Sequence, residues 1–298
     1  MTYSIVARDP DSGELGVAVQ SHWFSVGAVV PWAVPGVGAV ATQAAARVAY
    51  GPLALREMRS GASAGETLER LLADDANAAF RQVAVIDASG QTATHTGEAC
   101  IGFAGHVDGV QVSCQANMMA SETVWPAMLE AYNSSSGSLA ERLLSALDAA
   151  EAAGGDARGR QSAALLVVPG SGEDWETLVS LRVEDHPDPL GELRRLVRLA
   201  QAYRLATRAD ELTAAGRHDE AGELYRGALE RAPDNHELRF WAGIGAAQAG
   251  DMDHAVADVQ AAITAQPGWR DLLARLPEKV APAARALMAE IMQRERRS

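Results

Sequence analysis

The chain begins with MTYSIVARDPDSGELGVAVQS, Met1 to Ser21, and this stretch decides the fold. Residues 3–8 and 15–21 are rich in Val, Ala and Ile, and Asp11-Ser12-Gly13 between them has the composition of a turn. The pattern predicts a β-hairpin that starts almost at the first residue. Thr2, directly behind the methionine, is therefore expected at the start of a sheet strand rather than in a loose polar tail.

The segment from residue 1 to 188 predicts a mixed α+β domain. Its candidate strands are residues 3–8, 15–21, 28–32, 38–43, 82–87, 92–96, 110–115, 162–168 and 177–183. Helices fill the gaps in pairs, at residues 51–61 with 63–76, and at 121–132 with 139–155. Ser63 and Glu66 form a capping box, and Gly154-Gly155 ends the last helix. Hairpins that alternate with helix pairs favour a layered α+β fold over a strict βαβ alternation.

The segment from residue 189 to 298 predicts a small all-α domain with an internal repeat. Five residues recur 34 positions later: Gly216, Asp219, Ala221, Ala228 and Pro233 return as Gly250, Asp253, Ala255, Ala262 and Pro267. This is the tetratricopeptide (TPR) period, so we expect a TPR-like solenoid capped by helices at residues 190–207 and 282–297. Two interpretations stay open: a stabilising or dimerising appendage, or a groove that binds a peptide or protein.

Composition restricts the partners and the compartment. A formal net charge of −13 disfavours nucleic acid and anionic membranes as partners, because both attract basic surfaces. Two cysteines, Cys100 and Cys114, form no disulfide framework, and no secretory signal is visible, so we expect a cytoplasmic protein. The uncharged stretch at residues 22–46 contains Pro31 and Pro35 and predicts buried strands rather than a membrane span.

Lys279 is the only lysine of the chain. A Walker phosphate loop, a Ser-x-x-Lys acyl-enzyme and a pyridoxal-phosphate Schiff base each need a lysine at a defined place. The G-x-G-x-x-G, G-x-S-x-G, C-x-x-C and H-E-x-x-H motifs are also missing. These absences disfavour dinucleotide oxidoreductases, α/β-hydrolases and zincins, and we expect no cofactor.

Polar side chains gather at the ends of the predicted strands, where sheet-based active sites are usually built. The candidate substrate-binding residues are Ser21, His22, Gln43, His95, Gln161 and Ser162. Asn117 is either a structural turn residue or an oxyanion donor. Asp156 either caps a turn or orients a basic group, and Arg160 is either a solvated loop charge or part of the site. His95, Cys100, His106 and Cys114 lie close in sequence but lack tight zinc-ligand spacing, so no metal site is expected.

Several collinear blocks within residues 1–200 resemble the DUF1028 family, a bacterial and archaeal family of poorly defined activity. The blocks are MTYSIVARDPDSGELGVAV, VGAVVPWAVPGVGAVATQA, HTGEACIGFAGH, QANMM and GGDARGRQSAALLVV with LRVEDHPDPLGELRRL. The resemblance implies an N-terminal-nucleophile (Ntn) hydrolase-like fold, a four-layer αββα sandwich whose first strand carries the first residue of the mature chain at the catalytic centre.

The resemblance gives Thr2 a catalytic role. An Ntn enzyme uses the side chain of its first residue as nucleophile and its own α-amino group as base. Removal of Met1 would expose Thr2 without autoproteolysis. Threonine peptidases of this superfamily pair the nucleophile with a lysine, which residues 1–278 lack, so Asp156 with Arg160, or the amine alone, would have to tune Thr2.

Two functions follow from these observations. The first is an Ntn-type hydrolase that cleaves the C–N bond of a small amide, with Thr2, Asn117, Asp156 and Arg160 as catalytic residues. The second is a non-catalytic scaffold that binds a small ligand or a protein. We further expect a homo-oligomer and, through the TPR-like repeats, a protein partner.

Overall fold

The computed structural model describes residues 2–297, which form two compact units. One unit ends at Val197 and the other begins at Arg198, inside the long helix α5 (Pro189–Ala214). The sequence boundary at residue 188 falls before this helix. Leu190, Leu193 and Val197 of α5 are buried in the core of the first unit.

The first unit contains ten strands among the described residues. They are β1 (Thr2–Arg8), β2 (Leu15–Ser21), β3 (Pro31–Val34), β4 (Gly38–Ala44), β5 (Arg81–Asp87), β6 (Thr92–Thr96), β7 (Gly105–Gly109), β8 (Val112–Asn117), β9 (Ser162–Val168) and β10 (Val179–Val183). The α-helices are α1 (Tyr50–Arg59), α2 (Ala64–Ala73), α3 (Val124–Ser134) and α4 (Leu139–Ala152), and two short 3₁₀ helices are η1 (Val26–Ala28) and η2 (Ala78–Phe80). The mixed α+β prediction is confirmed.

The strands form two antiparallel sheets. One has the order β10-β9-β2-β1-β8-β7, and the other has the order β3-β4-β5-β6. β1 lies in the middle of the larger sheet, with Thr2 opposite Asn117 of β8. On β2, Ser21 lies opposite Ser162 of β9. The register therefore brings the beginning of β1 beside the ends of β2 and β8.

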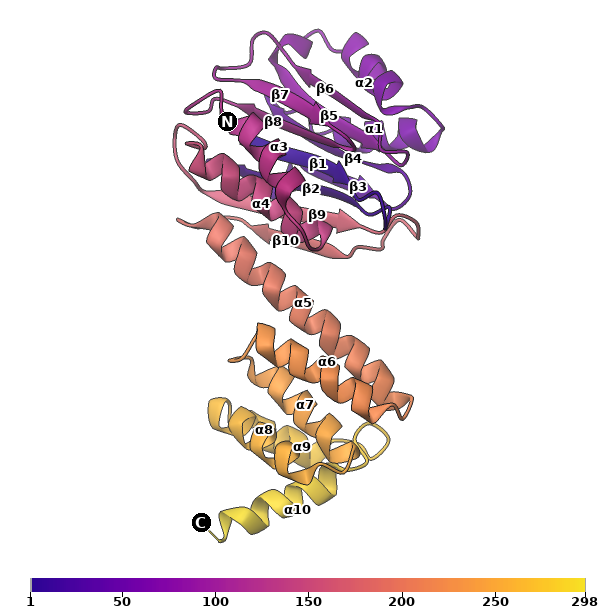
Figure 1. Cartoon of the computed structure of the whole chain (residues 1–298), viewed down its shortest axis with the longest axis vertical. Coiled ribbons are helices and arrows are strands. Elements are labelled where there is room, and N and C mark those ends of the chain that lie inside the picture. The colour runs from indigo at the N-terminus through magenta and orange to yellow at the C-terminus, as the bar shows by residue number, and fades with distance from the viewer. Residues whose placement is uncertain (1, 298) are drawn as a thin grey trace. The chain divides into compact units, whose positions relative to one another are not determined.

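The two sheets bury three apolar clusters, one on each outer face and one between them. α3 and α4 pack on one face of the larger sheet, and α1 and α2 pack on one face of the smaller sheet (Figure 1). The remaining faces meet in a third apolar cluster, which contains Val6, Val17 and Val19 from the larger sheet and Ala39, Ala41, Ala84 and Ile86 from the smaller. Because side chains alternate along a strand, Thr2, Ser4 and Val6 of β1 share the face between the sheets.

Two strand predictions need correction. Residues 28–32 were expected to form a strand, but Val26–Ala28 is a 3₁₀ turn and β3 begins only at Pro31. The Ser162 hydroxyl holds this turn by accepting the Val26 N–H at 3.1 Å. The edge strand β7, Gly105–Gly109, has no counterpart in the prediction, because its sequence GHVDG is bounded by glycines and lacks strong β-formers. The capping box at Ser63 and Glu66 is confirmed in both directions.

The second unit is helical throughout its regular elements. After residue 198 of α5 come α6 (His218–Arg231), α7 (His236–Gln248), α8 (Met252–Ala265), α9 (Gly268–Arg275) and α10 (Ala284–Glu295). The helix expected at residues 190–207 runs on to Ala214, and α9 has no counterpart in the prediction. α6 and α8 begin 34 residues apart, and the glycines before them, Gly216 and Gly250, both have positive φ.

The repeated alanines occupy tight helix contacts. Ala221 and Ala228 of α6 and Ala255 and Ala262 of α8 are all 2% exposed or less. We expect Ala255→Leu to overpack α8 and lower the free energy of unfolding by about 1–3 kcal/mol, measured by urea denaturation. The matched control is Ala261→Leu, because Ala261 is exposed on the same helix. Equal stability of the two variants would show that Ala255 is not a packing contact.

Within residues 2–297, no helix is both long enough and apolar enough to cross a bilayer.

Candidate functional site

Thr2 and Ser21 bring two hydroxyl groups together where the central strands β1 and β2 of the larger sheet begin and end. The Thr2 Oγ1 lies 3.1 Å from the Ser21 Oγ, and both side chains are buried. Both residues line a cavity of about 440 Å³, which also contacts Gln43. This volume falls within the usual range for small-ligand pockets. The structure thus places three candidate residues from separate strands around one cavity.

A network of buried side-chain amides holds the backbone of Thr2 in place. The side-chain amides of Gln43 and Asn117 donate to the Thr2 carbonyl at 3.2 and 3.5 Å. The same two NH₂ groups donate to the Gln82 Oε1, each at 2.8 Å. An NH₂ group has two protons, so both protons of Asn117 are already committed. Asn117 therefore positions Thr2, and its amide has no proton left for a substrate oxyanion.

Gln82 is the centre of this network. Its Nε2 lies within hydrogen-bond distance of the Thr96 Oγ1 and of the backbone carbonyls of Gly105 and Ala116, at 2.9, 3.1 and 2.9 Å. It therefore ties the smaller sheet to β7 and β8 of the larger one. Sequence reasoning missed Gln82, because a glutamine at the start of an apolar strand looks the same whether it faces solvent or a neighbouring sheet.

Ser4 of β1 and Gln115 of β8 extend this network further along the sheet. The Ser4 hydroxyl donates to the Gln43 Oε1 at 2.7 Å and accepts from the Gln115 Nε2 at 3.2 Å. Gln115 also donates to the Ala41 carbonyl at 2.9 Å. Such buried, mostly satisfied networks rigidify the elements that they connect. The beginning of β1 is therefore held in one position.

The segment from Asp156 to Ser162 lies close to Ser21 but contributes nothing to the cavity lining among the described residues. The buried Asp156 carboxylate accepts the His22 backbone N–H at 3.1 Å and pairs with Arg158 at 3.1 Å. The Ser162 hydroxyl donates to the Trp23 carbonyl. These contacts shape the chain that follows Ser21, so Asp156 and Ser162 support the cavity wall rather than face its interior.

Three further candidates lie on other surfaces. Arg160 forms ion pairs with Glu151 at 3.4 Å and Asp188 at 3.2 Å, and its side chain is 41% exposed. Gln161 donates to Asp185 at 3.2 Å. His95 lies 2.9 Å from the Ala78 carbonyl, on the opposite face of β6 from Thr96. The structure therefore does not bring Arg160, Gln161 or His95 to the cavity.

His22 follows Ser21 directly, but its ring is placed apart from the cavity lining. The Nδ1 atom is buried and has no hydrogen-bond partner among residues 2–297. Its backbone N–H is the group that Asp156 holds.

Arg81 is a cavity residue that the sequence did not indicate. It lines the same cavity as Val26, Val29 and Val30. Its guanidinium donates to Asp75 at 2.8 Å and to the Ala45 carbonyl. The Arg81 hydrogen bond is the main reason why the pKa of Asp75 lies far below its usual range. A lone arginine before a strand carries no sequence signal for such a role.

Two non-glycine residues beside this site have left-handed backbone conformations. Ala44 has φ of 66° and follows Gln43, and Met118 has φ of 62° and follows Asn117. Backbone strain of this kind costs about 1–3 kcal/mol and concentrates at functional sites. Ala44 also lines the cavity. The strain lies at the two strand ends that carry the amides bound to Thr2.

The four histidines and cysteines considered for zinc serve local structure. His106 lies 2.9 Å from the Thr96 hydroxyl, the Cys100 Sγ donates to the Arg81 carbonyl at 3.4 Å, and Cys114 is fully buried. Burial raises the pKa of the Cys114 thiol. In the part of the chain that the structure describes, no group of three or more His, Cys, Asp or Glu is arranged to bind a metal ion.

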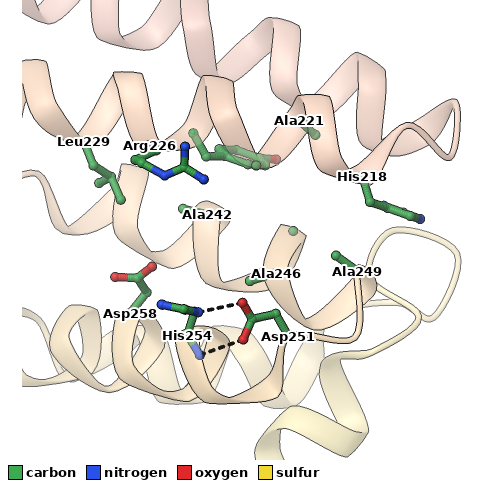
Figure 2. A pocket seen from close by; sticks show the side chains of 13 residues that line it. His218, Ala221, Arg226, Leu229, Ala242, Ala246, Ala249, Asp251, His254 and Asp258 are labelled. Atoms are coloured by element: carbon green, nitrogen blue, oxygen red, sulfur yellow. Dashed lines mark hydrogen bonds and ion pairs between the residues drawn. The ribbon is translucent and has the colours of Figure 1, made fainter.

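The helical unit has a smaller cavity of about 230 Å³ between α6, α7 and α8 (Figure 2). Its polar lining includes Arg226, Asp258, His254 and Asp251, and His254 and Asp251 are paired at 2.6 Å. Ala242, Gly245 and Ala246 of α7 also line it. This site combines both charge signs, unlike the Thr2 cavity.

The fold and the site define a mixed α+β protein with hydroxyl and amide groups gathered at one sheet edge. The sequence matches the family of unknown function DUF1028 over residues 2–193, and the chain belongs to that family. The crystal structure of protein SPO2555 from Silicibacter pomeroyi, which carries the same family assignment, is similar to it. The two chains are 33% identical with a TM-score of 0.62, over 67% of this chain and 89% of that one. No curated protein matches significantly.

Proposed function

We propose that the first unit is a four-layer αββα sandwich of the Ntn type and that it hydrolyses the C–N bond of a small amide. The observation that carries the proposal is the position of Thr2. Its hydroxyl lies at the beginning of a central strand, 3.1 Å from the Ser21 hydroxyl, and faces a cavity of about 440 Å³. An Ntn mechanism needs a hydroxyl or thiol residue at this place.

The proposed reaction uses Thr2 as the first residue of the active chain, after whatever precedes it has been removed. The Thr2 amine takes the proton of the Thr2 hydroxyl, and Oγ1 attacks the amide carbonyl. The amine then gives this proton to the leaving nitrogen as the C–N bond breaks. Water, deprotonated by the same amine, cleaves the resulting ester and restores the Thr2 hydroxyl.

The surrounding groups support this chemistry through position. Gln43 and Asn117 hold the Thr2 carbonyl, and Gln82 holds both amides. The Ser21 hydroxyl lies 3.1 Å from the attacking Thr2 oxygen, and its proposed role is to donate to the substrate carbonyl oxygen, on which negative charge develops during attack. Asp156 has an indirect role, because it holds the backbone of His22, directly after Ser21. Arg160 has no part in the proposed reaction.

A second function, a ligand-binding scaffold without catalysis, is favoured by the absence of a lysine before Lys279. Without lysine, the α-amino group is the only base that the proposed reaction has. Binding of small amides with no turnover at any pH would support the scaffold and contradict the hydrolase.

For the helical unit we propose a TPR-like solenoid that binds a protein partner, and for the whole chain a cytoplasmic homo-oligomer. The 34-residue spacing of α6 and α8 and the buried alanines at equivalent positions support the solenoid. The cavity between α6, α7 and α8 offers a groove with polar side chains to such a partner.

The pH dependence of hydrolysis tests the proposed base. A chain-terminal amine has a pKa of about 7.7–8.0 and accepts a proton only in its neutral form. We expect the rate on small acyl anilides to fall as pH drops through this range and to level off above it. The rates are followed by release of the aniline product. A rate that stays constant from pH 6 to 9, where the amine changes its charge, would contradict the amine as base.

A further inference from the structure

The Thr2 cavity has one charged side chain among its described lining residues, and that side chain is Arg81. The guanidinium is well buried, with 15% of the side chain exposed. A buried cation is stable only when its charge is balanced. The charges around Arg81 therefore indicate which kind of ligand the cavity can bind.

One carboxylate serves two guanidinium groups next to the cavity. Asp75 accepts from the Arg81 Nε at 2.8 Å, and the Arg47 Nη1 lies 3.6 Å from the same carboxylate oxygen. The Tyr50 hydroxyl also donates to Asp75 at 2.8 Å and adds no charge. Arg81 meets both oxygens of Asp75, and Arg47, outside the cavity lining and 38% exposed, lies beside the same carboxylate. These three side chains together carry a net charge of +1, in a chain whose formal net charge is −13.

Much of the cavity lining is apolar. Val26, Val29 and Val30 form an apolar part of it, the valine wall, and Trp23, with 62% of its surface exposed, also lines the cavity. The hydroxyl groups of Thr2 and Ser21 line the same cavity. The lining therefore combines an apolar region, two hydroxyl groups and the Arg81 guanidinium.

We propose that this site accepts a small amide that carries both an apolar group and a carboxylate, such as an N-acyl amino acid. The carboxylate binds at Arg81 and the apolar group packs on the valine wall. A single surplus positive charge matches one carboxylate better than a doubly charged phosphate. The inference rests on the proposed function only for the identity of the scissile amide. The binding of the carboxylate is independent of catalysis.

The test measures binding in the Thr2→Ala protein, so that hydrolysis cannot interfere. The probes are matched pairs: N-benzoylglycine against N-benzoylglycinamide, and N-octanoylglycine against N-octanoylglycinamide. Each pair differs only in the charge of one end. By titration calorimetry we expect each acid to bind about tenfold or more tightly than its neutral amide, as a charge-assisted contact provides.

Two variants assign the difference to this cavity. In the Thr2→Ala background, Arg81→Gln should reduce the preference for the acid to about twofold or less, with little change for the neutral probe. The control is Arg56→Gln, which removes the same charge from an exposed residue of α1 that does not line the cavity and should leave the preference intact. If Arg81→Gln does not fold, the matched pairs in the Thr2→Ala protein still decide.

Equal or tighter binding of the neutral probes would overturn the proposal, as would failure of every acid to bind at millimolar concentration. A preference that survives in folded Arg81→Gln protein would overturn it too. These outcomes are distinct from failure of the hydrolase proposal. Acids that bind at Arg81 but are never cleaved by the native protein contradict the hydrolase alone, whereas cleavage of neutral amides with no preference for acids contradicts the carboxylate site alone.

Discussion

Thr2→Ala is expected to reduce amide hydrolysis by at least about 10⁴-fold, because removing the nucleophile of a covalent mechanism has effects of this size or larger. The substitution removes one hydroxyl and one methyl group at the start of β1, and the Thr2 carbonyl keeps its contacts with Gln43 and Asn117. Folding should therefore change little. Steady-state rates on acyl anilides and thermal melts of both proteins measure the two effects.

Two related variants make this result specific. Thr2→Ser keeps a hydroxyl and should retain part of the activity. Ser21→Ala removes the neighbouring hydroxyl, 3.1 Å away, and should lower the rate without abolishing it. Activity that survives in Thr2→Ala but disappears in Ser21→Ala would transfer the nucleophile role to Ser21 and refute the assignment of Thr2.

Gln82→Leu should produce the largest loss of stability. The change keeps the approximate size of the side chain but removes the Oε1 that accepts from both Gln43 and Asn117. Each buried donor left without a partner costs about 1–3 kcal/mol, so the free energy of unfolding should fall by roughly 2–6 kcal/mol. Urea denaturation followed by far-UV circular dichroism measures the change.

The control for Gln82→Leu is Gln91→Leu in the turn between β5 and β6. Gln91 is exposed, and its side-chain amide donates to the Ser89 hydroxyl at 3.2 Å. Its substitution should change stability by less than about 0.5 kcal/mol. Comparable losses in the two variants would mean that the buried network adds nothing beyond the general cost of losing a polar side chain.

The sequence predicted much of the first unit because its strands carry a strong local signal. β1 and β2 were recognised from apolar runs bounded by turn residues, and the early start of β1 drew attention to Thr2. Ser21, Gln43 and Asn117 were chosen for their places at strand ends, and Thr2 was added because of the family resemblance. β7 was not predicted, because an edge strand can form with little β-forming sequence when its neighbour β8 supplies the pairing.

The errors at the site have a different origin. His95 was included for its place near a strand end, but side chains alternate, and the adjacent Thr96 is the residue that meets Gln82. Arg160 was included for its charge, and in the structure that charge pairs with Glu151 at the end of α4 and with Asp188, which lies 28 residues further along the chain. Arg81 was missed for the same reason: its role depends on a cavity that only the packed sheets create.

The most direct test of the central claim is the N-terminal sequence and intact mass of active protein made in its native host. Met1 lies outside the described residues. We expect the active species to begin with a free Thr2 amine, and we expect acetylation of that amine to abolish hydrolysis. A fully active protein in which Met1 still acylates the Thr2 nitrogen would contradict the mechanism, because an amide nitrogen cannot act as the base.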